Sequence, residues 1–391
     1  MIEFNFQVPT EINFGSGKIK EIGLKVSNMS RKPLILTMKD IVEAGVLNDV
    51  EKALQKEGIN YEICDEVSPE PTCQELDTLG RRLKNFDFDA IIGVGGGSVL
   101  DASKALAILL KNEGKIWDFV DLRDRPPRKL NSPNIPIIAV PTTSGTGSEV
   151  TVNSVLVNKA TVQKATIKFP SLMPKMAIID PELTLSLPPI ITGITGFDAF
   201  THALESYMNK QKRSLLSDML TRESMKLSYD YLEETIEKPN WLLGREKCAL
   251  ASLLAGISIA NVGTTVAHAI GQPATARLGI PHGLAVSIFT MPVLKRTRIH
   301  EKQRFSDLAA YLDPERCKGL NEEQKAIFLV DLVSELQDKC GVNHKLRQYS
   351  SSQEIIEQLT SDTCGYMGRG LPQHSVLFDE KEIRDIISEA Y

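Results

Sequence analysis

The sequence predicts an α/β domain followed by an all-helical domain, and three observations support this prediction. A chain of 391 residues exceeds the size at which a single hydrophobic core stops growing, so two domains are expected. Up to about residue 184, strand-like and helix-like segments alternate, which is typical of parallel strands with helical crossovers. Long helix-compatible stretches dominate afterwards. We therefore assign residues 1–184 to the α/β domain and residues 185–391 to the helical domain, with the pair Pro188 and Pro189 near the boundary.

Short apolar runs in the first domain have the length of buried strands, and the segments between them have helical periodicity. The expected order is a strand at 32–38, a helix at 45–59, a strand at 60–67, a helix at 72–87, a strand at 89–94, a helix at 98–112 and a strand at 135–141. The helices expected in the second domain cover 198–209, 213–236, 244–270 and 322–340. We expect the charged segment 121–130 to be a solvated loop.

The composition is that of a soluble globular protein, with 42% hydrophobic and 24% charged residues. The formal net charge of −5 gives no reason to expect a nucleic-acid partner. No segment reaches the roughly 18 uninterrupted apolar residues of a membrane span, and the N-terminal residues lack the pattern of a secretory signal. The six cysteines are scattered without a C-x-x-C pair, so we expect reduced thiols and a cytoplasmic location.

A glycine-rich turn follows the expected strand at 89–94, in the segment DAIIGVGGGSVLDASKA. Such a turn lets backbone N–H groups approach a pyrophosphate, and the following helix N-terminus favours an anion. The segment matches neither G-x-G-x-x-G, because Ser98 occupies the sixth position, nor the Walker pattern. The alternative is a structural turn in which Ser98 caps the next helix.

A second loop, PTTSGTGSEVT at 141–151, also follows a buried strand and is rich in small hydroxyl residues and glycines. Its side chains can hydrogen-bond to phosphate or ribose with little steric obstruction. Two such loops at strand ends favour a binding site for a dinucleotide, whereas each loop alone could be a long polar turn.

The segment GFDAFTHALESY at 196–207 places Asp198 four positions before His202, so both share one face of the expected helix. His268 and His282 lie in other helix-compatible segments without a charged surface context. One carboxylate and three imidazoles on rigid helices would suit a divalent transition metal. From spacing alone, the alternative of satisfied hydrogen-bonded side chains stays open.

Five segments, in this order and at these separations, resemble the iron-containing alcohol dehydrogenase family. They are GGGSVLDASKA, PTTSGTGSEVT, PKMAIIDPELTLSLPP, TGFDAFTHALESY and AHAIGQPATARLGIPHG. The resemblance covers roughly residues 5–295 and is lower over the last ninety or so. It implies a Rossmann-like N-terminal domain and a helical C-terminal domain, an architecture shared with dehydroquinate synthase, with the active site in the cleft between them.

The resemblance also implies roles for individual residues. The metal positions of the family fall on Asp198, His202, His268 and His282. Its pyrophosphate loop falls on Gly95, Gly96, Gly97 and Ser98, with Asp101 in the next turn, and its threonine-rich loop on Thr142, Thr143 and Thr146. Lys164 occupies a position where relatives often place a lysine near the cofactor.

Two departures from the family pattern affect the expected mechanism. Many relatives have a second histidine four residues after the third metal ligand, and this chain has Gln272 there. A glutamine amide can orient a substrate in the catalytic pocket but cannot shuttle a proton near neutral pH. The segment GLPQHSVLF at 370–378 replaces the usual Asn-Pro-Arg element, and we assign no role to its His374.

The choice of nucleotide depends on the end of the strand at 32–38. NAD-preferring relatives often have an acidic residue after its threonine, able to bind the ribose 2′-hydroxyl and to repel a 2′-phosphate. This chain has Met38 and then Lys39, although Asp40 follows closely. We expect NADP(H), or use of both nucleotides. The alternative is that Met38 and Lys39 merely end the strand.

The reaction implied is reversible hydride transfer between a nicotinamide and a small aldehyde or ketone, with Fe²⁺ or, alternatively, Zn²⁺ as Lewis acid. Alternatives on the same fold are a dehydroquinate synthase-like lyase and a glycerol or glycerol-phosphate dehydrogenase. A third is a nucleotide-binding protein without catalytic activity. The sequence does not identify the substrate, and relatives suggest a homodimer or larger homo-oligomer without a membrane partner.

Overall fold

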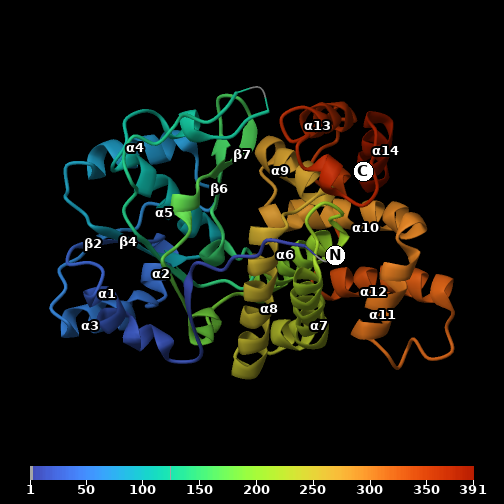
Figure 1. Ribbon diagram of the computed structural model, residues 1–391, viewed down its shortest axis with the longest axis horizontal. Coiled ribbons are helices and arrows are strands. Elements are labelled where there is room, and N and C mark those ends of the chain that lie inside the picture. Colours follow the sequence, from blue (N-terminus) through green and yellow to red (C-terminus); the bar gives the residue numbers. More distant parts are fainter. Residues whose placement is uncertain (1–2, 124) are drawn as a thin grey trace. The chain divides into compact units, whose positions relative to one another are not determined.

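The computed structural model describes residues 3–123 and 125–391 and divides into two compact units (Figure 1). The α/β unit comprises Val8–Leu187 together with Asn240–Ala249. The helical unit comprises the segment that ends at Gln7, Pro188–Pro239 and Leu250–Tyr391. The predicted combination of a Rossmann-like part and a helical part is confirmed.

The α/β unit is built on a six-stranded parallel sheet with the order β1-β8-β5-β4-β2-β3. Its strands are β1 (Glu11–Phe14), β2 (Pro33–Leu36), β3 (Glu62–Cys64), β4 (Ala90–Gly95), β5 (Ile137–Pro141) and β8 (Met176–Ile179). In the register of β4 and β5, Gly95 lies opposite Pro141. The glycine-rich loop and the threonine-rich loop therefore leave the sheet side by side, at the carboxyl ends of adjacent strands.

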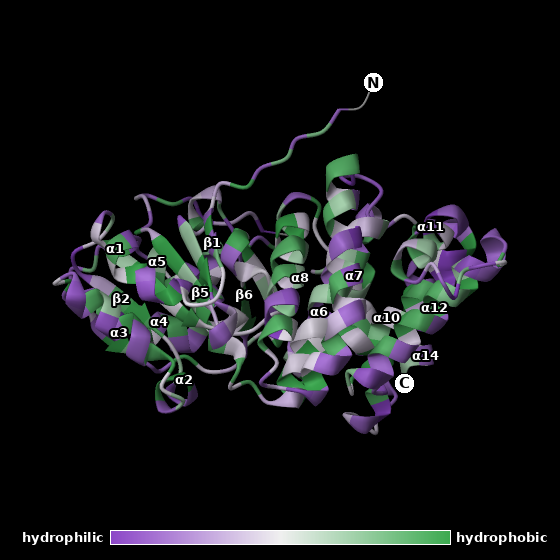
Figure 2. Ribbon diagram, turned by 90° about the horizontal axis from the view of Figure 1, so that it is seen from below, coloured by the Kyte–Doolittle hydropathy of each residue, from purple (hydrophilic) through white to green (hydrophobic). Residues whose placement is uncertain are grey.

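Helices cover both faces of this sheet because its strands are apolar on both sides. The helices of the unit are α1 (Ile22–Ser27), α2 (Lys39–Glu43), α3 (Leu47–Lys56), α4 (Cys73–Leu83) and α5 (Gly97–Leu109). Along β2, Leu34 and Leu36 pack with α4 and α5, whereas Ile35 packs with α1 and α3 on the opposite face. Figure 1 shows these two helical layers, and Figure 2 shows α3 as a mixture of hydrophilic and hydrophobic residues.

A two-stranded antiparallel hairpin, β6 (Asn153–Asn158) and β7 (Gln163–Lys168), follows the threonine-rich loop. The sequence analysis did not predict it. Along β6, fully and partly buried residues alternate, as expected for a strand with one face against the protein. The hairpin packs on α5, so it holds the end of the threonine-rich loop against that helix.

The helical unit contains nine helices among the described residues. They are α6 (Pro189–Met208), α7 (Leu215–Glu237), α8 (Leu242–Asn261), α9 (Val266–Leu278), α10 (His282–His300), α11 (Lys302–Leu312), α12 (Glu322–Lys339), α13 (Glu354–Cys364) and α14 (Glu380–Ala390), and the first turns of α8 belong to the α/β unit. Short 3-10 helices in the two units are η1 (Lys18–Glu21), η2 (Ile116–Phe119), η3 (Ser148–Val150), η4 (Pro170–Leu172), η5 (Pro181–Thr184), η6 (Leu346–Gln348) and η7 (Leu371–Gln373). Pro189 is the first residue of α6, a position whose N–H has no partner within the helix, so the missing N–H of proline costs no hydrogen bond there.

The expected single helix at 244–270 is wrong, because α8 and α9 are separate helices bent by 101°. Gly263 in the break has φ +93, a left-handed conformation that an α-helix does not contain. Among the described residues, no single helix is both long and apolar enough to cross a membrane, although α8 and α9 together pass that test as a bent pair.

Candidate metal centre and nucleotide-binding loops

Four of the predicted site residues come together in the helical unit. Asp198 and His202 lie one turn apart on α6, His268 lies on α9, and His282 is the first residue of α10. Their ligand atoms all lie within 4.8 Å of one another. The Asp198 Oδ1 atom is 3.6 Å from His268 Nε2 and 4.0 Å from His202 Nε2. The sequence-based grouping of these four side chains therefore agrees with the geometry.

Glycines allow the three helices to approach closely enough to form this cluster. A Cβ atom at Gly283 would lie 2.8 Å from the Ile194 carbonyl oxygen and 3.1 Å from Asp198 Cβ, so a side chain there would push α10 away from α6. A Cβ atom at Gly271 would lie 2.8 Å from Val286 Cγ2, between α9 and α10. The backbones therefore set the positions of the imidazoles.

The cluster is buried and contains polar atoms that the protein does not satisfy. Asp198 and His268 are each 3% exposed. Within residues 3–123 and 125–391, Asp198 Oδ1 and His268 Nε2 have no hydrogen-bond partner. Orphaned buried acceptors are costly unless something unseen binds them. A divalent cation would satisfy both atoms, so the donor set fits Fe²⁺ or Zn²⁺.

The charges in the cluster stabilise the anionic carboxylate. Burial alone would raise the pKa of Asp198, but His202, followed by His268 and His282, outweighs burial and holds this pKa well below its usual range. Burial lowers the pKa of His268, whereas Glu205 and Asp198 more than offset this and raise it to about 9. The site is therefore arranged for a carboxylate surrounded by positive charge.

Glu205 supports this cluster from behind, and the sequence analysis did not identify it. Its fully buried carboxylate accepts hydrogen bonds from the backbone N–H groups of Thr265 (3.1 Å) and Ala267 (2.6 Å) and from the Thr265 hydroxyl (3.0 Å). It also lies 2.5 Å from His268 Nδ1. Burial raises the pKa of Glu205, but His268 and these donors lower it overall, so Glu205 is ionised.

The spacing in the sequence could have indicated this role. Asp198, His202 and Glu205 follow one another at i, i+4 and i+7, so all three lie on one face of α6. Because the Glu205 carboxylate accepts the Nδ1 proton of His268, Nε2 is the ring nitrogen that would bind a cation, in exchange for the proton that the raised pKa keeps on it.

Gln272 lies one turn after His268 on α9, as predicted. It is 8% exposed, and its Oε1 atom has no hydrogen-bond partner among the described residues. A buried amide oxygen without a partner is suited to bind a small ligand. Its expected role as a substrate-orienting group stays a prediction.

The glycine-rich loop joins β4 to α5 through a turn with little space for side chains. Gly96 precedes α5 without a side-chain cap from the described part of the chain. A Cβ atom at Gly95 would lie 2.5 Å from Val99 Cγ2, and one at Gly97 would lie 2.6 Å from Thr146 Cγ2. The uncapped helix N-terminus suits an anion such as a pyrophosphate. The Ser98 hydroxyl donates to the Pro69 carbonyl rather than capping α5.

The predicted threonines lie beside this turn. Thr142 donates its backbone N–H to the Gly95 carbonyl (3.1 Å), and Thr143 is the nearest side chain to Gly96. The Thr146 hydroxyl accepts a hydrogen bond from the Ser148 backbone N–H at 3.3 Å. The structure therefore brings the two predicted loops together, and their nucleotide contacts stay predictions.

A buried lysine that the sequence analysis missed holds this loop in place. Lys104 on α5 is fully buried, and its Nζ donates to the carbonyl oxygens of Ser148 and Asn153, both at 2.7 Å, and to Ser148 Oγ at 2.6 Å. Burial lowers its pKa to about 8, although the carboxylates of Asp101 and Glu149 counteract this effect. The lysine in DASK is thus a structural cation inside the α/β unit.

Asp101, predicted near the cofactor, uses both carboxylate oxygens within the protein. Oδ1 accepts from Ser148 Oγ at 2.6 Å, and Oδ2 accepts from the Val155 backbone N–H at 2.9 Å. Lys164, on β7, is 5% exposed and forms an ion pair with Glu70 at 2.6 Å. In this structure Asp101 positions the threonine-rich loop and Lys164 is held by Glu70.

Met38, predicted at the nucleotide ribose, is the residue before α2 and has no side-chain capping bond among the described residues. It is partly buried against the core, and the following Lys39 and Asp40 are exposed. A lysine rather than a carboxylate therefore follows Met38 at the carboxyl end of β2.

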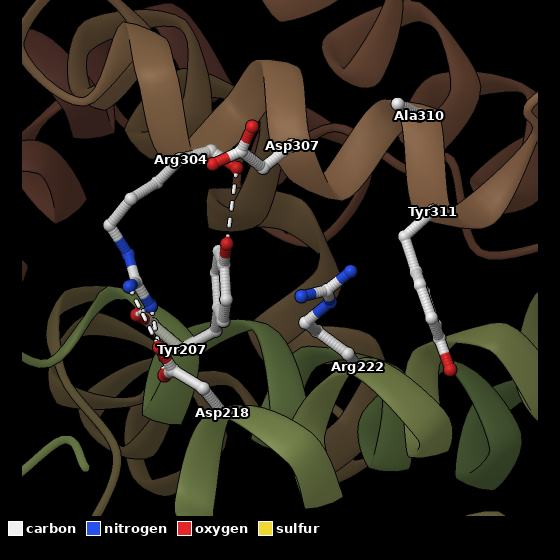
Figure 3. Close-up of a pocket in the computed structure, with 7 residues that line it drawn as sticks. All are labelled: Tyr207, Asp218, Arg222, Arg304, Asp307, Ala310 and Tyr311. Atoms are coloured by element: carbon white, nitrogen blue, oxygen red, sulfur yellow. Dashed lines mark hydrogen bonds and ion pairs between the residues drawn. The ribbon is translucent and has the colours of Figure 1, made fainter. Parts of the chain in front are cut away.

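A separate cavity of about 490 Å³ lies within the helical unit (Figure 3). It is lined by Tyr207, Asp218, Arg222, Arg304, Asp307, Ala310 and Tyr311. Arg304 binds Asp218 with two hydrogen bonds and lies over the Tyr207 ring, and Arg222 lies over the Tyr311 ring. Its two arginines and two aspartates balance in charge, and none of the four clustered residues lines it.

The protein thus combines a Rossmann-like α/β unit, with paired loops at its strand ends, and an all-helical unit with a buried carboxylate–imidazole cluster. The family model described as iron-containing alcohol dehydrogenase matches residues 9–181. The model described as Fe-containing alcohol dehydrogenase family, C-terminal, matches residues 192–391. The chain belongs to the iron-containing alcohol dehydrogenase family, and it is an oxidoreductase of the alcohol dehydrogenase type.

Similar proteins cover nearly the whole chain. A sulfoacetaldehyde reductase from Bilophila wadsworthia is 36% identical over 348 residues, which are 88% of each protein. An archaeal halo-thermophilic alcohol dehydrogenase from a Red Sea brine pool is 27% identical, with a TM-score of 0.93 over 100% of both chains. A sulfoacetaldehyde reductase from Bifidobacterium kashiwanohense, solved in complex with NAD⁺, is 28% identical, with a TM-score of 0.86 over 100% of this chain and 99% of that chain.

Proposed function

We propose that this protein reduces small aldehydes to alcohols, reversibly, with NAD(P)H and a divalent metal bound by Asp198, His202, His268 and His282. The observation that carries the proposal is the buried cluster of these four side chains, in which Asp198 Oδ1 and His268 Nε2 have no hydrogen-bond partner among the described residues. Membership of the family supports the general reaction. Fe²⁺ is the metal we propose, with Zn²⁺ as the alternative, since both accept three imidazoles and a carboxylate.

When bound, the metal supplies a Lewis acid for the substrate oxygen. The residues of the chain contribute position and charge. Glu205 keeps the Nδ1 proton of His268 in place, and the Gln272 amide orients the substrate. The uncapped N-terminus of α5 and the threonine-rich loop bind the nucleotide phosphates.

The reaction balances as aldehyde, NAD(P)H and one proton giving alcohol and NAD(P)⁺. The hydride goes to the carbonyl carbon, and the proton goes to the oxygen. The Gln272 amide does not release a proton near neutral pH, so water or a ribose hydroxyl delivers it.

For the nucleotide, we propose NADP(H) or use of both nucleotides. Support comes from Met38, which offers no carboxylate before α2, and from the exposed Lys39 that follows it. A carboxylate at that point would repel a 2′-phosphate, whereas a lysine attracts it.

The test is a panel of C2 to C4 aldehydes, assayed with NADH and NADPH in parallel on protein reconstituted with Fe²⁺ or Zn²⁺. The panel contains sulfoacetaldehyde, uncharged aldehydes and semialdehydes. Sulfoacetaldehyde is included because a 36% identical relative is named a sulfoacetaldehyde reductase. We expect nucleotide oxidation that depends on both metal and aldehyde. Metal-loaded protein that oxidises neither nucleotide with any aldehyde would contradict the proposal, and phosphate release from a sugar phosphate would point to the lyase reaction instead.

A further inference from the structure

His374 occupies a buried position in the helical unit and contacts two threonines from different helical segments. Its Nδ1 atom is 3.0 Å from the Thr265 hydroxyl at the start of α9, and its Nε2 atom is 2.9 Å from the Thr297 hydroxyl on α10. The residue is 0% exposed. The neighbouring Gln373 connects the same segment to the end of α6, because its Oε1 atom accepts a hydrogen bond from Asn209 Nδ2 at 3.2 Å.

These contacts extend the support of the metal centre by two further residues. Starting at the candidate ligand His268, Nδ1 meets Glu205 Oε2, Glu205 Oε1 meets the Thr265 hydroxyl, and that hydroxyl meets His374 Nδ1. The chain of hydrogen bonds ends at Thr297, whose hydroxyl is also 2.8 Å from the Val293 carbonyl. We use the term relay chain for His268, Glu205, Thr265, His374 and Thr297.

Counting protons gives this relay chain a direction. Both oxygens of the Glu205 carboxylate face backbone donors, Oε2 the N–H of Thr265 and Oε1 the N–H of Ala267, so both act as acceptors. The Thr265 hydroxyl has one proton and lies 3.0 Å from both Glu205 Oε1 and His374 Nδ1. If that proton went to His374, two acceptor oxygens would face each other across 3.0 Å. The hydroxyl therefore donates to Glu205.

The tautomer of His374 follows from this assignment. Burial, together with Lys210, lowers the pKa of His374 to about 4 despite the opposing effect of Glu205, so the ring is neutral and carries one proton at pH 7. Since the Thr265 proton is already used, His374 must donate from Nδ1 to the Thr265 oxygen. The Thr297 hydroxyl, which donates to the Val293 carbonyl at 2.8 Å, lies 2.9 Å from the Nε2 atom on the other side of the ring. The protons on His374 Nδ1 and on the Thr265 hydroxyl therefore both point toward Glu205.

We propose that His374 is a positioning residue for the metal centre: it orients the Thr265 hydroxyl onto Glu205, and Glu205 in turn fixes the tautomer and the ring orientation of the ligand His268. This inference rests on the proposed metal site. It assigns a role to the segment at 370–378, where the chain departs from the Asn-Pro-Arg element of the family. Outer-shell groups of this kind tune the affinity of a metal without touching it.

Two pairs of substitutions separate this role from simple packing. An asparagine side chain places an N–H two bonds from Cβ, as His374 Nδ1 does, whereas a glutamine places it one bond further, near the Nε2 position. His374→Asn therefore keeps the donor to Thr265, and His374→Gln loses it. In the same way, Thr265→Ser keeps the hydroxyl and Thr265→Val removes it. Thr290→Val on α10 is the matched control, because the Thr290 hydroxyl is buried and its one hydrogen bond within the described part of the chain goes to the Val286 carbonyl of its own helix.

The measurement is Co²⁺ affinity of the purified full chain in competition with a chelator, together with the d–d absorption spectrum of the Co²⁺ complex. We expect His374→Gln and Thr265→Val to bind Co²⁺ about 5- to 10-fold more weakly than wild type and to alter the spectrum, because supporting groups in an outer shell change metal affinity by about tenfold. We expect His374→Asn, Thr265→Ser and Thr290→Val to stay within about twofold. The melting temperature of each metal-free variant shows that the fold is retained, and the Thr265 pair carries the test if a His374 variant does not fold.

The outcomes distinguish the two proposals. Wild type that does not bind Co²⁺ would overturn the metal site and the proposed function with it. Normal Co²⁺ binding by wild type and by all variants would overturn the relay chain alone. Equal weakening by His374→Asn and His374→Gln would also overturn it, because packing rather than the Nδ1 donor would then be responsible.

Discussion

Replacing the buried Lys104 with methionine tests how the threonine-rich loop is held. Methionine has a similar length but no donor. In Lys104→Met the carbonyl oxygens of Ser148 and Asn153 lose their 2.7 Å hydrogen bonds. Ser148 Oγ keeps its 2.6 Å hydrogen bond to Asp101. The substitution therefore orphans two backbone acceptors and removes the positive charge next to two carboxylates.

The magnitude follows from these contacts. Lys104 Nζ lies 3.8 Å from Asp101 Oδ1, and both groups are largely inaccessible to water. Removing one partner of a buried ion pair typically costs about 3–5 kcal/mol, because the remaining charge is uncompensated. For a unit of this size, 1 kcal/mol corresponds to about 2–4 °C in melting temperature. We therefore expect Lys104→Met to melt roughly 10 °C below wild type.

The assay is thermal unfolding followed by circular dichroism, combined with a fluorescence titration of NADPH. We also expect weaker NADPH binding, since the loop at 141–151 loses its fixed end. Lys111→Met is the control, because Lys111 is exposed and, among residues 3–123 and 125–391, its ammonium makes a single ion pair, 3.9 Å from Asp87, of a type that contributes about 0–1 kcal/mol. Equal stability of the two variants would refute the argument that Lys104 fixes the loop.

Three other predictions concern separate parts of the molecule. His268→Ala removes one of the four proposed ligands, so metal content after dialysis and turnover should fall together, and full turnover without loss of metal would contradict the proposed site. Met38→Asp should shift the ratio of kcat/KM values toward NADH by about tenfold or more through repulsion of the 2′-phosphate. The control Met38→Asn can cap α2 equally well without the charge, and an equal shift in both variants would refute this cause. Burial raises the pKa of Glu149 from 4.5 to about 7, so its contribution to stability is present below about pH 4.5 and is lost as the pH rises through about 7. Glu149→Gln removes this dependence and should gain stability relative to wild type between pH 5 and pH 8, by at most about 3 kcal/mol in the free energy of unfolding. If the free energies of unfolding of wild type and Glu149→Gln differed by the same amount at pH 5 and at pH 8, the buried carboxyl would not be the cause.

The sequence predicted those features that depend on local pattern. The apolar runs at 89–94 and 135–141 became β4 and β5, because a continuous apolar run needs burial on both faces. The i, i+4 spacing of Asp198 and His202 placed both on one face of α6. The resemblance to the family then grouped them with His268 and His282, which spacing alone could not do.

Features that depend on distant contacts were not predictable in this way. The break between α8 and α9 lies in a helix-compatible stretch, and it depends on Glu205, which takes the N–H groups of Thr265 and Ala267. Lysines are almost never fully buried, so the residue type of Lys104 predicts a surface position. The residue is fully buried because the hairpin of β6 and β7 packs on α5, a contact that the sequence pattern does not indicate. The partners of His374 come from segments 77 and 109 residues away.

The bend at Val262–Thr265 has a consequence for how the length of this chain can change. The carbonyl oxygens of Val262 and Gly263 accept from the side chains of Asn209 and Ser206, and the N–H of Thr265 donates to Glu205, so the segment has no slack between these points. One extra residue between Gly263 and Thr265 would displace the N–H groups of Thr265 and Ala267 from Glu205, and with them the start of the helix that carries His268. Insertions and deletions should therefore be tolerated in the exposed turn after β6 but not in the four-residue segment Val262–Thr265, whose length sets the position of α9.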